Sequence, residues 1–125
     1  VPGARRSLGR IKDRLTLVKP GEELARGLRA LDTAGHSPGH ISIEAAGGDG
    51  LIVGGDAITH PLLSFRHPGW PSMGDQDQER AASVRNRLLD RLATDRAKLI
   101  GFHLPYPGLG HVERAQDGYR FAPAT

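Results

Sequence analysis

Short runs of alternating apolar and polar residues dominate the first half of the chain and predict β-strands. Such runs occupy residues 14–18, 28–32 and 41–46, and an apolar run follows at 51–53. Residues 47–50, Gly-Gly-Asp-Gly, separate the last two runs. Because glycine accepts positive φ without steric cost, this arrangement predicts a β-hairpin.

The second half opens with a long loop and then changes to a helical period. Residues 54–74 are rich in proline and glycine, and loops of this length in compact domains usually carry function or are disordered. Asp75 with Gln78 resembles a capping box, and Val84, Leu88 and Leu92 repeat with helical spacing. The pattern therefore predicts a helix that begins near Asp75.

After this helix the pattern returns to strands. The helix is expected to end within 95–98, and residues 99–102 form a short apolar run that predicts a buried strand. Residues 112–114 and 119–121 flank a Gln-Asp-Gly turn and predict a last hairpin. The order of strands, helix and strand predicts a mixed α/β layer fold.

Composition narrows the class of protein. The chain has 125 residues, which suits one domain, and it has no cysteine, which excludes disulfides and thiolate metal ligands. It has neither an apolar run long enough to span a membrane nor a signal-peptide core, so we expect no membrane partner and a cytoplasmic protein. It begins with Val1 rather than Met, which indicates a processed, truncated or partial chain.

The net charge is +3, and much of the excess lies near the N-terminus. Such a basic segment can contact nucleic acid or an acidic membrane. A surface that binds single strands needs aromatic residues interleaved with the basic ones. Here aromatic residues are scarce and are not interleaved with the basic residues. We therefore expect a solvated basic face and do not expect nucleic acid as a partner. The residues concerned are Arg5, Arg6, Arg10, Lys12 and Arg14.

Three polar residues stand at the ends of apolar runs, where metal ligands are usually held: His36, Asp56 and His103. His36 projects from the glycine-framed turn Gly-His-Ser-Pro-Gly-His, and a rigid base is what a metal ligand needs. A carboxylate at the end of a buried strand is costly unless it is paired, hydrogen-bonded or bound to a cation. Taken singly, each residue could instead be a turn histidine, a loop cap or a satisfied core histidine. The three together favour a site at one edge of the sheet.

The remaining histidines are weaker candidates. His40 follows His36 by four residues, but the intervening Pro-Gly argues against a helical metal pair, so we expect His40 to support a ligand rather than to be one. His60 and His67 lie in the long loop and could line a pocket or face water. His111 follows a glycine and could contact a substrate.

Three segments in order resemble the metallo-β-lactamase-fold hydrolases. TAGHSPGHIS is similar to the T-P-G-H-T-P-G-H-x-S segment of that family, LIVGGDA to its strand ending in Gly-Asp, and GFHLPYPGLGHV to the C-terminal histidine segment of its lactonase, arylesterase and methyl-parathion-hydrolase-like branch. The loop and helix HPLLSFRHPGWPSMGDQDQERAASVRNRLLDRLA also resemble that branch. The likeness covers roughly residues 14–123.

The resemblance implies specific roles. His36 would bind one zinc ion, Asp56 would bridge two zinc ions, and His103 would bind the second. A metal-bound hydroxide would attack an ester, lactone, thioester or phosphotriester. The loop bearing Phe65, His67 and Trp70 would wall the substrate pocket.

One family motif is missing. H-x-H-x-D-H, which supplies the other four zinc ligands, occurs nowhere in these 125 residues. The resemblance therefore implies a single partial domain, residues 1–125: the C-terminal half of an αββα sandwich, with one mixed sheet and a covering helix. The three candidates alone offer each zinc ion only two ligands, below the three protein ligands typical of catalytic zinc.

Two functions follow as hypotheses. The first is a portion of a zinc-dependent hydrolase that is inactive as an isolated fragment. The alternative is a non-catalytic half-domain that acts as an obligate dimer or a binding module. In both, one apolar sheet face would need a partner: the missing N-terminal half, a second copy or a swapped arrangement.

Overall fold

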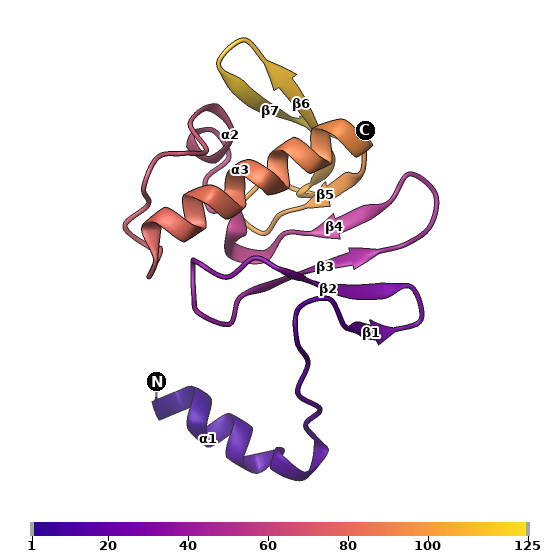
Figure 1. Ribbon diagram of the computed structural model, residues 1–125, viewed down its shortest axis with the longest axis vertical. Helices are drawn as coiled ribbons and strands as arrows, with labels where there is room; N and C mark the ends of the chain where they lie inside the picture. The colour runs from indigo at the N-terminus through magenta and orange to yellow at the C-terminus, as the bar shows by residue number, and fades with distance from the viewer. Residues whose placement is uncertain (1, 125) are drawn as a thin grey trace.

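One mixed sheet organises the chain in the computed structural model, which describes residues 2–124 (Figure 1). Within these residues the sheet has seven strands, and their spatial order follows the sequence. All neighbouring pairs are antiparallel except β4 and β5, which are parallel. The strands are β1 (Glu23–Ala25), β2 (Leu28–Asp32), β3 (Ile41–Ala45), β4 (Leu51–Val53), β5 (Lys98–Ile100), β6 (Leu109–Ala115) and β7 (Gly118–Pro123).

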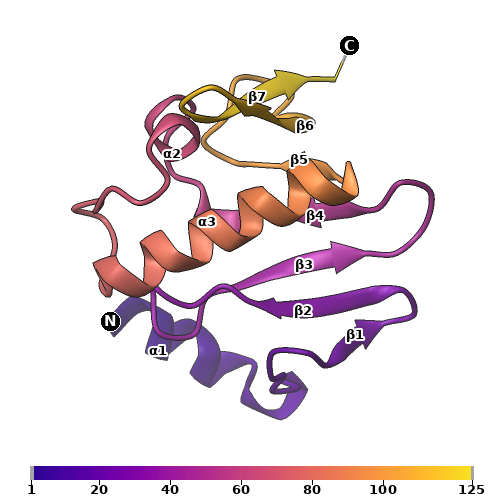
Figure 2. The ribbon, with the colours of Figure 1, turned by 45° about the horizontal axis from the view of Figure 1, so that its top comes forward.

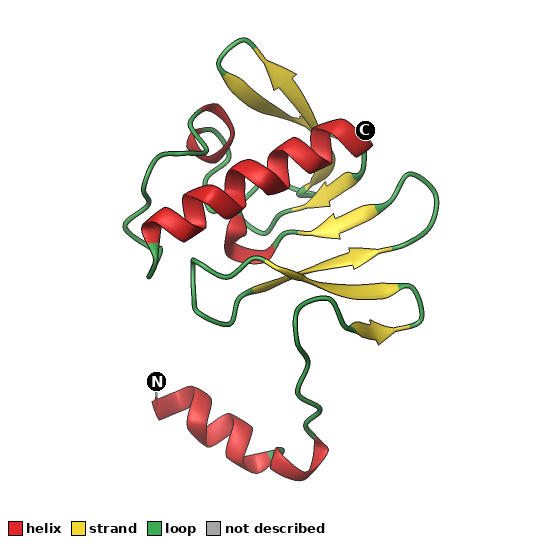
Figure 3. Cartoon of the chain, in the orientation of Figure 1, coloured by secondary structure: helices red, strands yellow, loops and turns green. Residues whose placement is uncertain are grey.

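One long helix lies across one face of this sheet (Figure 3). The long helix α3 (Gln78–Asp95) connects the parallel strands β4 and β5 and lies across the sheet in both ribbon views (Figure 2). The short helix α2 (Leu63–Arg66) contacts β7. An N-terminal helix, α1 (Pro2–Arg10), and two 3-10 helices (Lys12–Arg14 and Gly55–Ala57) complete the described elements.

The core lies between α3 and the sheet. From the sheet it receives Ile52, Leu99 and Val112, one from each of three neighbouring strands. From α3 it receives an apolar stripe that recurs every three to four residues, which is why this segment is helical: Val84, Leu88, Leu89 and Leu92. Full burial of such a side chain stabilises the fold by about 1.5–3 kcal/mol relative to exposure.

The start of α3 differs from the prediction by two residues. Asp77, not Asp75, caps the helix: its side chain accepts a hydrogen bond from the backbone N–H of Arg80 at 3.0 Å. Both aspartates precede the same apolar stripe, and the tertiary structure decides between them because Asp75 is buried in other contacts. At the other end, Arg96 adopts the left-handed conformation (φ 57°) and ends the helix.

The strand predicted at residues 14–18 is wrong. Part of this segment is a 3-10 turn and the rest is coil, with Leu17 90% exposed. The edge of β2 is already occupied by β1 and the residues just before it, since Glu22 and Gly21 exchange backbone hydrogen bonds with Ala30. An alternating pattern without a free partner strand cannot become part of the sheet.

The other predicted elements are confirmed with shifted ends. The strands at 28–32 and 51–53 have the predicted bounds, and the two hairpins form as predicted. The buried strand predicted at 99–102 runs instead from Lys98 to Ile100, and Phe102 is exposed beyond it. Helix α1 is entirely exposed, so its arginines form a solvated basic face. Among the helices of residues 2–124, none is long and apolar enough to cross a membrane.

The sheet face opposite α3 is apolar. Strand register aligns Ile43, Val53, Ile100 and Leu109 in one continuous row across β3 to β6. All four side chains are partly exposed, whereas their neighbours on the α3 face, such as Ile52 and Leu99, are buried. This row has the apolar character that the family resemblance implies for the face of a half-sandwich.

Candidate metal centre

His36, Asp56 and His103 converge at one edge of the sheet. Asp56 follows β4 and His103 follows β5, and because these two strands are parallel their carboxyl ends meet. His36 lies in the turn between β2 and β3. The Nε2 atom of His36 lies 3.6 Å from Asp56 Oδ2, and that of His103 lies 2.9 Å from Asp56 Oδ1. The two imidazoles therefore face different oxygens of one carboxylate.

The turn that bears His36 is docked against the start of α3. The backbone carbonyls of Gly35 and His36 accept hydrogen bonds from the N–H groups of Asp77 (3.0 Å) and Gln76 (3.2 Å). Gly35 has a φ of +149°, and a Cβ at this position would lie 2.6 Å from the backbone of Ala81. Only glycine permits so close an approach, so the sequence places His36 on a rigid base.

A buried aspartate holds the ring of His36. Asp75, whose side chain is fully buried, has Oδ1 3.1 Å from His36 Nδ1 and accepts a 2.7 Å hydrogen bond from Arg85 on Oδ2. An ionised carboxylate only accepts hydrogen bonds, so His36 donates from Nδ1 and its Nε2 lone pair remains free toward Asp56. Carboxylate–histidine pairs of this kind orient metal-ligating histidines.

This role of Asp75 is not predicted from the sequence, where the spacing of Asp75 and Gln78 indicates a helix cap. A signal was present in the helix itself. Arg85 precedes Leu88 by three residues and Leu92 by seven, which places a charge on the apolar stripe. A buried charge needs a partner of opposite sign, and an acidic residue in the segment before the helix could have been sought for it.

His40 supports the loop that carries Asp56. Its Nε2 accepts the backbone N–H of Asp56 at 2.9 Å, and its Nδ1 lies 3.1 Å from the carbonyl of Thr33 and 2.8 Å from that residue's hydroxyl. The Thr33 hydroxyl contacts that of Ser42 (3.0 Å), which donates to the carbonyl of Gly54 (3.0 Å). This buried network fixes both ends of the turn that leads to Asp56.

Two further features lock this turn. Burial lowers the pKa of His40 below its ordinary value, which favours the neutral ring that can accept a hydrogen bond on Nε2. Gly55 has a φ of +56°, and a Cβ there would lie 2.7 Å from His40 Nε2. The Gly-Gly-Asp sequence is therefore needed to bring the backbone of Asp56 against this imidazole.

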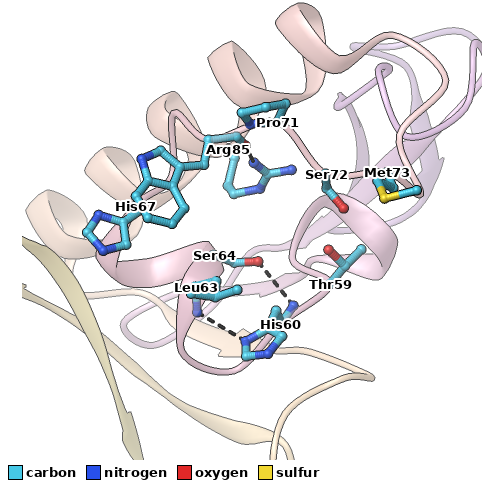
Figure 4. Close-up of a pocket in the computed structure, with 10 residues that line it drawn as sticks. Thr59, His60, Leu63, Ser64, His67, Pro71, Ser72, Met73 and Arg85 are labelled. Atoms are coloured by element: carbon cyan, nitrogen blue, oxygen red, sulfur yellow. Dashed lines mark hydrogen bonds between the residues drawn. The ribbon is translucent and has the colours of Figure 1, made fainter.

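A pocket of about 350 Å³ lies between the loop that follows Asp56 and Arg85 of α3 (Figure 4). His67 and Trp70, both predicted to wall a pocket, line it and stack on each other with ring centroids 4.0 Å apart. His60 lines it as well, and its Nδ1 accepts the backbone N–H groups of Leu62 and Leu63. The pocket is amphipathic, since Leu63 and Met73 share its wall with Ser64, Ser72 and Arg85.

The structure places the other two predicted substrate residues apart from this pocket. Phe65 is 1% exposed and lies in the core near Phe121, so its side chain packs the fold in this conformation. His111 pairs with Lys98 at the amino end of β5, whereas His103 follows the carboxyl end of that strand. It lines a different depression, together with Asp49 and other charged residues.

Comparison with solved structures reveals the relatives of this fold. AidC, described as a dizinc quorum-quenching lactonase in complex with a product, is 28% identical, with a TM-score of 0.89 over 99% of this chain and 42% of its own. The hydrolase AbOPH of the β-lactamase superfamily is 27% identical, with a TM-score of 0.89 over 97% of this chain and 43% of its own. This chain belongs to the metallo-β-lactamase superfamily.

Its architecture is that of the C-terminal half of the metallo-β-lactamase fold, and the chain spans about 42% of the length of AidC. AiiA of Bacillus thuringiensis shares the fold, with 24% identity and a TM-score of 0.55 over 67% of this chain. No protein-family model matches the sequence, and no curated protein matches it.

The donor set fits part of a dizinc site. In a tetrahedral zinc site each ligand atom lies about 2.0–2.1 Å from the ion, so two ligand atoms lie about 3.3 Å apart. The two imidazole–carboxylate distances, 3.6 Å and 2.9 Å, are close to this separation. Within residues 2–124 there is no group of three or more ligands around one point, because the three residues meet only in pairs. Each of the two imidazole–carboxylate pairs supplies two donor atoms, fewer than the three protein ligands typical of catalytic zinc.

Proposed function

We propose that this chain forms half of the active centre of a zinc-dependent hydrolase that cleaves an ester, a lactone or a related bond. The observation that carries the proposal is the pairing of two imidazole nitrogens with different oxygens of Asp56. A carboxylate flanked in this way is suited to bridge two cations. His36 would serve one ion, His103 the other, and Asp56 both.

The chain's own residues would divide the remaining work. Bound zinc would act as a Lewis acid toward a carbonyl oxygen and would lower the pKa of a coordinated water. Asp75 would hold the His36 ring, and His40 would hold the backbone of Asp56. The pocket with His67 and Trp70 would bind the organic part of the substrate beside the metal centre.

The substrate class rests on the same pocket and on the relatives. The pocket begins at Thr59, three residues after Asp56, and extends to Met73, beside a glycine that lies close to His36. Its mixed wall suits a molecule with an apolar part and a polar ester or lactone group. AidC, a lactonase with a bound product, supports this class.

The remaining zinc ligands would come from a segment outside these 125 residues. Three protein ligands per ion are typical of catalytic zinc, and the present residues supply two. In the proposed protein, a half-domain bearing H-x-H-x-D-H would cover the apolar row on β3 to β6 and complete both coordination spheres. The isolated chain would then be inactive.

The test compares the chain alone with the same chain joined to a half-domain that carries this motif. The joined protein should hold two zinc ions by elemental analysis and hydrolyse p-nitrophenyl acetate or an acyl-homoserine lactone, and Asp56→Asn should abolish both properties. The chain alone should show neither tight zinc binding nor turnover. A joined, folded protein without zinc would contradict the proposal.

The apolar row on the open face favours a second candidate, a non-catalytic half-domain that dimerises through this face. Sedimentation of the isolated chain distinguishes the two. The hydrolase proposal predicts a monomer that exposes apolar surface and binds a hydrophobic dye. A tight dimer that does not bind the dye would favour the second candidate.

A further inference from the structure

Arg85 is the most deeply buried charged residue among those that the proposed function leaves unused. Its side chain is 3% exposed. Nη1 donates to the carbonyls of Pro68 (3.0 Å) and Trp70 (3.1 Å), and Nη2 donates to Asp75 (2.7 Å). These acceptors belong to two functional parts of the chain: the loop that carries Trp70 of the pocket wall, and the support of His36.

We propose that Arg85 and Asp75 are positioning residues that hold His36 and the loop segment 68–70, which carries Trp70 of the pocket wall, as one unit. Only the description of His36 as a zinc ligand rests on the proposed function. The coupling of the imidazole to the pocket wall is a property of the folded chain itself.

The contacts of Asp75 divide cleanly between the two parts. One carboxylate oxygen accepts from Arg85 and the other faces His36 Nδ1. The arginine pairs with this buried carboxylate, since an unpaired buried charge is costly. Asp75 can therefore keep a proton on His36 Nδ1 and leave Nε2 free toward Asp56.

The guanidinium geometry accounts for the choice of arginine. A planar fork with several fixed donors reaches two backbone carbonyls and a carboxylate at once, which the compact ammonium of lysine does not reproduce. The Trp70 carbonyl held by Arg85 belongs to the residue whose indole stacks on His67. Arg85 lines the same pocket, where its position relative to the loop is visible (Figure 4).

The substitution Asp75→Asn gives a specific expectation. If the amide oxygen keeps the bond to Arg85, the amide NH2 faces His36 Nδ1 and must find an acceptor there. The proton of the His36 ring then moves to Nε2, the atom that faces Asp56. The side chain keeps its volume while the orientation of the imidazole lone pair is reversed.

The first experiment measures this tautomer in the metal-free 125-residue chain by long-range ¹H–¹⁵N spectra of the histidine rings. The wild-type chain should carry its His36 proton on Nδ1, and Asp75→Asn should carry it on Nε2. The matched control is Asp77→Asn, which removes the same charge two residues away and keeps a good helix cap. An unchanged His36 tautomer in Asp75→Asn would overturn the proposal.

The second experiment tests the coupling with Arg85→Lys, and Arg87→Lys on the same helix is the control. Trp70 is the only tryptophan and is 57% exposed, so the anisotropy of its fluorescence reports how firmly this part of the pocket wall is held. Arg85→Lys should lower this anisotropy and should also disturb the His36 signals. It should weaken the response of His36 to added zinc by about 10- to 100-fold, the usual effect of losing such support.

If Arg85→Lys changes the Trp70 fluorescence but not the His36 signals, Arg85 only anchors the loop. That result would overturn the proposed coupling. If Arg85→Lys fails to fold by circular dichroism, the tautomer in Asp75→Asn decides. Neither readout requires hydrolysis. A chain with the expected tautomer but no zinc or activity in the joined protein would refute the proposed function and leave this inference standing.

Discussion

The two sides of the candidate metal centre differ in how firmly this chain holds them. On one side, His36 sits on a turn bound to the start of α3, with its ring held by a buried aspartate–arginine pair. On the other, His103 lies on an exposed loop with its side chain 48% exposed, and the hydrogen bond found for its ring goes to Asp56 itself. The folded chain therefore fixes the His36 ring through buried contacts, whereas it provides no buried contact for the His103 ring among the described residues.

The difference follows from the energetics of burial. Loss of either member of a buried ion pair leaves an uncompensated charge, so the contacts of Asp75 and Arg85 are costly to break. The His103 loop is closed by backbone hydrogen bonds between Gly101 and Gly108 and between Gly108 and Pro105. These bonds define the path of the loop, and none of them involves the imidazole.

The largest expected effect is the loss of the buried pair. Arg85→Met removes the partner of a buried carboxylate and should lower the free energy of unfolding by about 3–5 kcal/mol. His103→Ala, on the exposed side, should change it by no more than about 0.5 kcal/mol. Urea denaturation followed by circular dichroism measures both, and equal effects would remove the distinction between the two sides.

The support of Asp56 gives the next effect. Gly48 and Gly55 have similar φ values of +53° and +56°, but only a Cβ at Gly55 would meet the His40 ring. Gly48→Ala should cost about 1–2 kcal/mol of stability from the backbone conformation alone. Gly55→Ala should cost about 1–3 kcal/mol more, since it adds the steric conflict. Equal losses in the same denaturation assay would mean that His40 does not lock this turn.

The smallest effect belongs to an exposed ion pair, the counterpart of the buried one. The Arg114 guanidinium, 2.7 Å from Asp90, holds the pKa of that carboxyl below its ordinary value of 3.8. A lowered pKa in the folded state gives a contribution that is present above pH 3.8 and is lost as pH falls through the folded value. Asp90→Asn should therefore change stability only slightly at pH 7 and in a salt-dependent way. A large, salt-independent loss would contradict this ranking.

Much of the fold could be predicted from local patterns. The hairpin around Gly47 to Gly50 and the stripe of Val84, Leu88 and Leu92 depend on neighbours in sequence, and both are confirmed. The strand predicted at residues 14–18 failed because strand formation also needs a free partner edge. The prediction that Asp75 caps the helix failed for a similar reason. Asp75 contacts His36, 39 residues away in sequence, and Asp77 caps the helix instead.

The three candidate ligands could be predicted from the sequence, whereas the residues that hold them in place were harder to predict. His36, Asp56 and His103 come together because each follows an apolar run, a property visible in the sequence. The pairing of His40 with the backbone of Asp56 depends on the tight path of Gly54 and Gly55, which no local pattern specifies. The position of Phe65 could not be predicted either, since an aromatic residue in a long loop can line a pocket or fill the core, and Phe65 is in the core.

In the proposed function, Asp56 is shared by two cation positions, one with His36 and one with His103. Titration of the ¹⁵N-labelled chain with zinc, followed through all six histidine rings, tests it most directly. We predict that the His36 and His103 signals shift while those of His60, His67 and His111 do not, and that Asp56→Asn suppresses both shifts where the control Asp49→Asn suppresses neither. Zinc-induced shifts confined to the other histidines, or an undiminished response in Asp56→Asn, would contradict the account.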